Sequence, residues 1–175
     1  MSTTPDNDKP ADDAAPALHS GRFEGRTRFQ QMIRDALACA AREGWRELIL
    51  CDADFGDWPL GERAVAESLQ SWSKTGRKCV LLAKRYDEVM LRHARFVTWR
   101  RTWSHIIDAR GCSSADPLEL PSAIWSPAWV MQRLDPVRCN GYSGTEPDRR
   151  VLLRENINEW LQRSSPAFPA QRLGL

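Results

Sequence analysis

The sequence predicts a single α/β domain with a mixed, largely parallel sheet and helices on both faces. Three short apolar segments, each typical of a buried strand, occupy residues 48–51, 80–82 and 105–107. About fifteen residues with helical periodicity separate one segment from the next. Parallel strands need a crossover of this length, which is usually a helix. The chain has 175 residues, of which 42% are hydrophobic, so it is long enough for one domain with its own core.

The first half of the chain alternates helices and strands. Thr27 is suited to cap a helix, and Gly44 to end it. Gly76 closes a second helix in the same way, and a loop rich in turn-forming residues precedes that helix. The expected elements are a helix at 27–43, a strand at 46–53, a loop at 54–59, a helix at 62–74 and a strand at 78–83.

The second half begins with a third helix and strand and then changes character. Ser126 and Pro127 indicate a turn between two strands, and the stretch 141–144 is expected to be a flexible turn. The expected elements are a helix at 86–103, a strand at 105–109, two strands within 123–134, a short edge strand at 137–139 and a helix at 148–163.

The N-terminal residues differ in composition from the rest. They contain four aspartates, one lysine and three prolines but few large apolar side chains. This predicts a disordered acidic tail at 1–21, followed by one domain at 22–175. The formal net charge of the whole chain is only +2, which is too small to indicate a nucleic-acid or membrane partner by itself.

The sequence has no features of a membrane or exported protein. No apolar stretch approaches the roughly 20 residues of a membrane helix, and the N-terminus lacks the basic and apolar regions of a secretion signal. Five scattered cysteines without a Cys-x-x-Cys pair argue against a disulfide framework and a zinc site. We therefore expect a cytoplasmic protein with buried, reduced cysteines, no cofactor and no membrane partner.

Several polar positions and their spacing carry a resemblance to a known family. Arg92-His93 leads into Arg100-Arg101 and Ser104-His105-Ile106-Ile107, and the end of the chain has Ile157, Trp160, Ser164 and Arg172-Leu173-Gly174-Leu175. With the strands at 48–52 and 80–82, this pattern resembles an uncharacterised bacterial domain family related to one half of phospholipase D. The resemblance covers residues 23–175 and implies the phospholipase D-like three-layer fold.

The resemblance also implies that the active site is degenerate. Members of the superfamily hydrolyse or transfer phosphodiesters with a His-x-Lys-x4-Asp motif, in which one histidine attacks phosphorus and a second protonates the leaving group. Two copies are needed, from two halves or a dimer. The motif belongs near residues 119–129, where this chain has no histidine or lysine, and none of its three histidines begins the pattern. No catalytic residue is therefore assigned.

The leading hypothesis is a non-catalytic binding module whose partner is either a protein or a phosphate-bearing ligand. Arginines interleaved with Trp99 and Trp103 are typical of phosphate and base contacts, and also of a solvated helix face. The candidate ligand-binding residues are Arg92, His93, Arg100 and Arg101. His93 is also expected to satisfy a hydrogen bond in the core.

A protein partner or self-association is the other version of this hypothesis. Trp58, Trp125 and Trp129 lie in or beside loops, where they are suited to line a partner surface. The sequence thus leaves a protein partner and a nucleic-acid or phosphate ligand both open.

An enzyme is the alternative. Asp52 and Asp54 follow the first strand at its carboxyl end, where open α/β folds place their chemistry. Two carboxylates at this spacing are suited to hold Mg²⁺ beside a phosphate, as in a metal-dependent phosphohydrolase. The competing interpretation is that these acids cap the loop that follows and the next helix.

Overall fold

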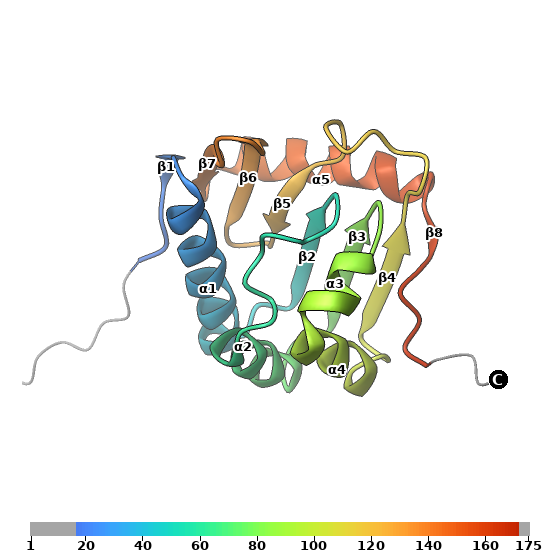
Figure 1. Cartoon of the computed structure of the whole chain (residues 1–175). Coiled ribbons are helices and arrows are strands. Elements are labelled where there is room, and N and C mark those ends of the chain that lie inside the picture. Colours follow the sequence, from blue (N-terminus) through green and yellow to red (C-terminus); the bar gives the residue numbers. More distant parts are fainter. Residues whose placement is uncertain (1–16, 172–175) are drawn as a thin grey trace, which may run out of the picture.

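The computed structural model describes residues 17–171 and contains one mixed sheet of eight strands (Figure 1). The order across the sheet is β1-β7-β6-β5-β2-β3-β4-β8. The strands are β1 (Gly21–Phe23), β2 (Glu47–Asp52), β3 (Lys78–Ala83), β4 (Ile107–Gly111), β5 (Ser122–Trp125), β6 (Val130–Asp135), β7 (Asn140–Gly144) and β8 (Ser165–Pro166). The helices are α1 (Arg26–Glu43), α2 (Arg63–Ser73), α3 (Asp87–Arg92), α4 (Ala94–Thr102) and α5 (Pro147–Gln162).

The α/β class with a mixed sheet is confirmed, but the expectation of a largely parallel sheet is wrong. Only β2–β3 and β3–β4 are parallel, whereas the other five strand pairs are antiparallel. After β4 the chain no longer crosses over through helices. It enters β5 antiparallel to β2 and continues through two hairpins to β7, and the short strands β1 and β8 close the two edges.

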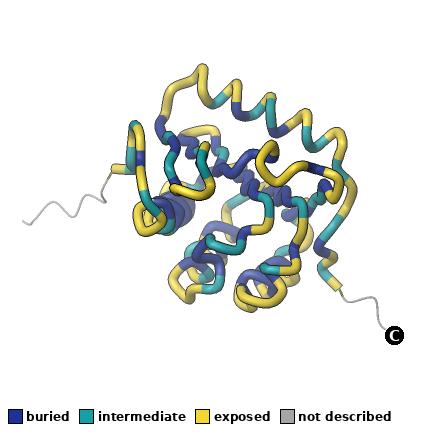
Figure 2. Tube along the Cα trace, turned by 45° about the horizontal axis from the view of Figure 1, so that its top comes forward, coloured by how far each residue is buried: buried dark blue, intermediate teal, exposed yellow. Residues whose placement is uncertain are grey.

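Successive side chains of β2 point to opposite faces of the sheet, and each face has its own hydrophobic cluster. Leu48 and Leu50 belong to the larger cluster, to which α1, α2 and α4 contribute side chains. Ile49 and Cys51 belong to the smaller cluster, with Leu153 and Ile157 of α5. Helices therefore cover both faces, and Figure 2 shows the buried strands between helices with exposed outer turns. No helix within residues 17–171 is long and apolar enough to cross a membrane.

The expected helix at 86–103 is divided into α3 and α4 at His93. This residue has φ −122° and ψ 57°, outside the helical region, and its side chain is buried. His93 Nε2 lies 2.8 Å from the carbonyl oxygen of Phe55, so a tertiary hydrogen bond forms at the point where the helix is interrupted. The apolar periodicity continues across this break and did not reveal it.

The expected edge strand at 137–139 and the flexible turn at 141–144 are both wrong. Residues Asn140–Gly144 form β7, an internal strand between β1 and β6. Gly141 lies so close to the backbone of Gln132 that there is no room for a Cβ atom. Glycine is disfavoured in strands. A strand that needs glycine so that a neighbouring strand can approach closely therefore has a sequence typical of a turn.

The sheet also holds part of the segment expected to be a tail. The carbonyl of His19 accepts hydrogen bonds from Trp129 Nε1 at 2.9 Å and Ser143 Oγ at 2.8 Å, and β1 begins at Gly21. Residues 1–16 of the expected tail lie outside the described residues.

Candidate ligand-binding cleft

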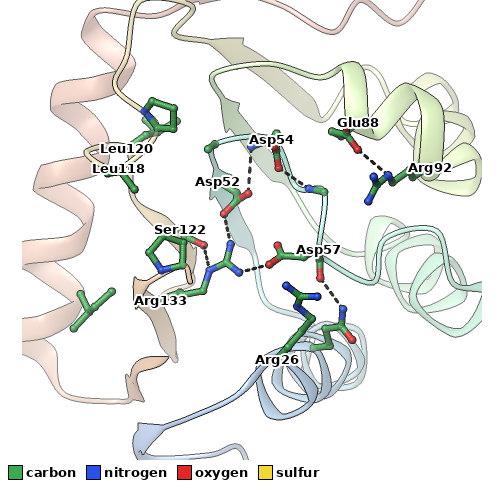
Figure 3. A pocket seen from close by; sticks show the side chains of 16 residues that line it. Arg26, Asp52, Asp54, Asp57, Glu88, Arg92, Leu118, Leu120, Ser122 and Arg133 are labelled. Atoms are coloured by element: carbon green, nitrogen blue, oxygen red, sulfur yellow. Dashed lines mark hydrogen bonds and ion pairs between the residues drawn. The ribbon is translucent and has the colours of Figure 1, made fainter. Parts of the chain in front are cut away.

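A cleft of about 730 Å³ opens at the carboxyl ends of β2 and β3 (Figure 3). Its lining comes from the loop after β2, the start of α1, the end of α3, the loop before β5, and β6. Because β5 is antiparallel to β2, its first residue, Ser122, lies beside the last residues of β2. Open α/β sheets bind their ligands beyond the carboxyl ends of the parallel strands. The sequence-based choice of this end of the sheet thus coincides with a real cavity.

The floor of the cleft is organised by the buried Arg133 of β6. Its Nη2 lies 3.0 Å from Asp52 Oδ1, and its Nη1 donates to Asp57 Oδ2. Its Nε donates to Ser122 Oγ at 3.1 Å, and its guanidinium lies 4.2 Å from the centre of the Phe29 ring. The arginine is therefore enclosed by partners of this chain.

The charge of Arg133 is strongly favoured in this position. Burial by itself would lower the pKa of the guanidinium, but the hydrogen bond to Asp57 and the charges of Asp52 and Asp57 outweigh it and raise the pKa above its usual value. Arg133 therefore keeps its charge and joins Asp52 and Asp57 in one ion network.

Asp52 is committed to this network and to the loop after β2. Its Oδ2 accepts hydrogen bonds from the backbone N–H groups of Asp54 (3.2 Å) and Phe55 (2.8 Å). Phe55 has a φ of 58°, a left-handed conformation that is uncommon for a bulky residue. Asp54 in turn accepts from the N–H of Gly56 at 2.8 Å. Both aspartates thus have the loop contacts that one sequence-based interpretation expected, but neither caps α2, whose N-terminus has no side-chain cap.

The structure brings Asp52 and Asp54 to the same cleft without completing a metal site around them. Within residues 17–171, no group of three or more histidine, cysteine, aspartate or glutamate side chains is placed to hold a metal ion. A magnesium ion at this position would have to compete with Arg133 and two backbone N–H groups for Asp52.

The walls combine apolar side chains with charges of both signs. Leu118 and Leu134 line the cleft while remaining 77% and 67% exposed. The charged lining consists of three arginines and four carboxylates, namely Arg26, Arg92, Arg133, Asp52, Asp54, Asp57 and Glu88. With more acids than bases, this lining does not favour an anion.

The four candidate binding residues do not meet at one site. Arg92 lines the cleft and pairs with Glu88 at 2.7 Å. His93 is buried behind it, and Arg100 is buried with its Nε donating to the carbonyl of Phe168 at 3.1 Å. Arg101 lines a separate, smaller hollow beside Tyr86 and Phe168. Three of the four are thus directed away from the cleft.

The tryptophans proposed for a partner surface are mostly internal. Trp58 and Trp129 are buried, and the half-buried Trp125 lies under the guanidinium of Arg154 at 4.5 Å. The residue that sequence reasoning missed is Arg133. It stands in a strand with no distinctive neighbours, and only the register of β6 shows that it points inward toward Asp52.

Comparisons with known proteins identify a similar fold but no family. No protein-family model and no curated protein sequence matches the chain. A solved structure titled as that of TrmBL2, an archaeal chromatin protein showing a novel mode of DNA binding, matches with a TM-score of 0.65 and 12% sequence identity. The match covers 89% of this chain and 57% of the archaeal chain. This likeness shows a shared fold.

Proposed function

We propose that the chain is a non-catalytic, phospholipase D-like binding module and that it binds a protein over the cleft. The observation that carries the proposal is the exposure of large aliphatic side chains around the cleft. Leu118 and Leu134 line the cleft and are 77% and 67% exposed, and we call them the aliphatic rim. Exposed aliphatic groups gathered around a cavity are typical of a protein-binding surface.

The floor of the cleft supports binding without catalysis. No histidine or lysine is among the residues that line it, and its buried arginine and Asp52 are occupied by each other. The segment at 119–129, where the phospholipase D motif would be expected, contributes Leu120, Pro121 and Ser122 at this end of β5. Of these, only Ser122 carries a nucleophilic group. Its Oγ accepts from Arg133 Nε at 3.1 Å, and the lining of the cleft has no histidine or lysine to take its proton.

The partner that best fits this surface is a second copy of the chain. The rim of the cleft has the exposed cation Arg26 and the exposed carboxylate Asp54, neither of which forms an ion pair with a described residue. A two-fold axis through such a surface brings opposite charges together around an apolar centre. The pairing of two halves in the superfamily that the chain resembles is consistent with this arrangement.

The archaeal neighbour's reported DNA binding makes nucleic acid the second ligand to test. Its 12% identity does not transfer any residue to this chain. The cleft itself, with four carboxylates against three arginines, is a poor site for a phosphate backbone. A protein in the cleft is therefore the preferred function.

The experiment is sedimentation velocity on the full chain at concentrations up to about 100 μM, where a micromolar dimer is populated. We expect association that weakens only modestly as salt rises, because exposed ion pairs are screened whereas the contacts of the leucines are not. Leu118→Asp with Leu134→Asp should weaken it at least tenfold, by roughly 1.4 kcal/mol or more. The control is Val151→Asp, which changes an exposed apolar residue of α5 in a different hollow.

A monomer at every concentration would refute the dimer, and equal weakening by the control would show that the rim is not the contact. The non-catalytic part has its own test with Mg²⁺ and a panel of phosphoesters. Turnover that is lost in Asp52→Asn would establish the enzyme alternative based on Asp52 and Asp54.

A further inference from the structure

A cluster of cations lies at the end of the sheet opposite to the cleft. It consists of five exposed residues, which we call the basic edge: Arg42, Arg46, Lys74, Arg77 and Lys78. The parallel strands β2 and β3 start at the same end of the sheet, and α1 and α2 end there (Figure 1). Residues that are far apart in the sequence are therefore placed side by side.

Backbone and side-chain contacts fix this arrangement. The N–H groups of Arg77 and Lys78 donate to the carbonyl of Arg46 at 2.9 and 3.2 Å. Nearby, Trp72 Nε1 of α2 donates to the carbonyl of Trp45 at 2.7 Å. Both tryptophans are buried, so the segments that carry the cations are anchored in the core.

The five cations are available for a ligand. None of them forms an ion pair with a described residue. Of the two carboxylates nearest in the sequence, Glu47 pairs with Arg154 at 2.9 Å. The exposed Glu43 accepts from the neutral Trp45 Nε1 at 2.9 Å, so its charge counts against the five cations. The carboxyl ends of α1 and α2 contribute about half a negative charge each, which five cations outweigh.

The residue types of the basic edge indicate whether it suits a membrane surface or a nucleic acid. The large apolar side chains that are exposed in residues 17–171 all lie elsewhere: Met90, Leu91, Leu118, Leu134, Val137, Val151 and Leu152. A membrane-binding surface combines cations with apolar groups that enter the lipid, and this edge has no such exposed group. A group of exposed cations without exposed apolar side chains fits the phosphate backbone of a nucleic-acid duplex.

We propose that the basic edge binds the phosphate backbone of duplex nucleic acid without sequence preference. This second surface is independent of the cleft and of its proposed partner. Contacts to phosphates alone position a protein on the duplex but do not read its bases, so two duplexes of different sequence should bind equally.

The test measures fluorescence anisotropy of a labelled DNA duplex of about 20 base pairs with the full chain over a range of salt concentrations. Five phosphate contacts predict a slope of log affinity against log salt of about −4.5. Arg46→Ala, Arg77→Ala and Lys78→Ala together should weaken binding at least tenfold at low salt and reduce the slope by about 2.7. Each single substitution should reduce it by about 0.9, which keeps the test valid if the triple variant does not fold.

The matched control removes three exposed arginines from other surfaces, with the same change in net charge: Arg22→Ala, Arg28→Ala and Arg85→Ala. It should bind nearly as tightly as the unmodified protein. The proposal is overturned if the duplex does not bind at low salt or if the control loses as much affinity as the triple variant. It is also overturned if the protein binds anionic phosphatidylserine vesicles but not the duplex.

Discussion

Arg133 illustrates how one residue sets the chemistry of the cleft. Its guanidinium fills the position between Asp52, Asp57 and Ser122, where a ligand or metal would otherwise find open carboxylates. Burying this charge is costly, and the cost is offset only while the partners remain in place. The stability of the domain and the occupation of Asp52 and Asp57 therefore depend on the same residue.

Replacing this arginine should be strongly destabilising. We expect Arg133→Met to lower the free energy of unfolding by about 3 to 5 kcal/mol, because Asp52 is left buried and unpaired. Urea denaturation measures the loss. Adding Asp52→Asn should recover part of it, while the control Arg149→Met in an exposed ion pair should cost less than about 1 kcal/mol. A cost below about 1 kcal/mol for Arg133→Met would contradict the role assigned to the network.

Between elements, α1 and the start of α2 are joined by a surface ion pair. Arg34 Nε lies 2.6 Å from Glu62 Oε1, and both side chains are partly exposed. The hydrogen bond from Arg34 is the main cause that lowers the pKa of Glu62 below its ordinary value of 4.5. The stability that this pair contributes is therefore present above pH 4.5 and is lost as the pH falls through the lower pKa of the folded state.

Because the pKa of Glu62 is lowered, the effect of Glu62→Gln on stability should depend on pH. Near neutral pH the variant should be less stable by a few tenths of a kcal/mol up to about 1, as is usual for an exposed pair. The difference should shrink as the pH falls below 4.5 and disappear once Glu62 is protonated in the folded protein. Thermal unfolding of both proteins between about pH 3 and pH 7 measures it. A difference that grows on acidification would show that the pair does not act in this way.

At the scale of the whole molecule, the core includes every cysteine. All five thiols are free and buried, as the sequence predicted. Burial is the main cause that raises the pKa of Cys39, Cys51, Cys79 and Cys112, so the reactive thiolate is suppressed as well as shielded.

Thiol titration should follow the integrity of the fold. We expect a disulfide reagent such as DTNB to modify none of the cysteines rapidly in the native protein and all five in denaturant. The rate in native buffer should increase in Arg133→Met, because local and global opening become more frequent. Rapid modification of one thiol per native molecule would show that a cysteine is accessible.

An element of the fold could be predicted where its signal lies in the local sequence. The strand at 78–83 and the helices with strong apolar periodicity follow from the local sequence. Their buried side chains form a run or recur at each helical turn, and this pattern is visible without knowledge of the tertiary structure. The direction of β5 beside β2 is not encoded locally. It depends on pairing between segments some seventy residues apart, which is why the largely parallel sheet was expected in error.

The sequence by itself determined the α/β class, the covered faces of the sheet and the buried cysteines. Only the tertiary structure decided that Arg92 and Arg101 face different hollows, that His93 and Arg100 are internal, and that Arg133 closes over Asp52. The physical reason is that periodicity reports which side of an element is buried. The partner that a charged side chain meets is set by the register and packing of elements distant in the chain.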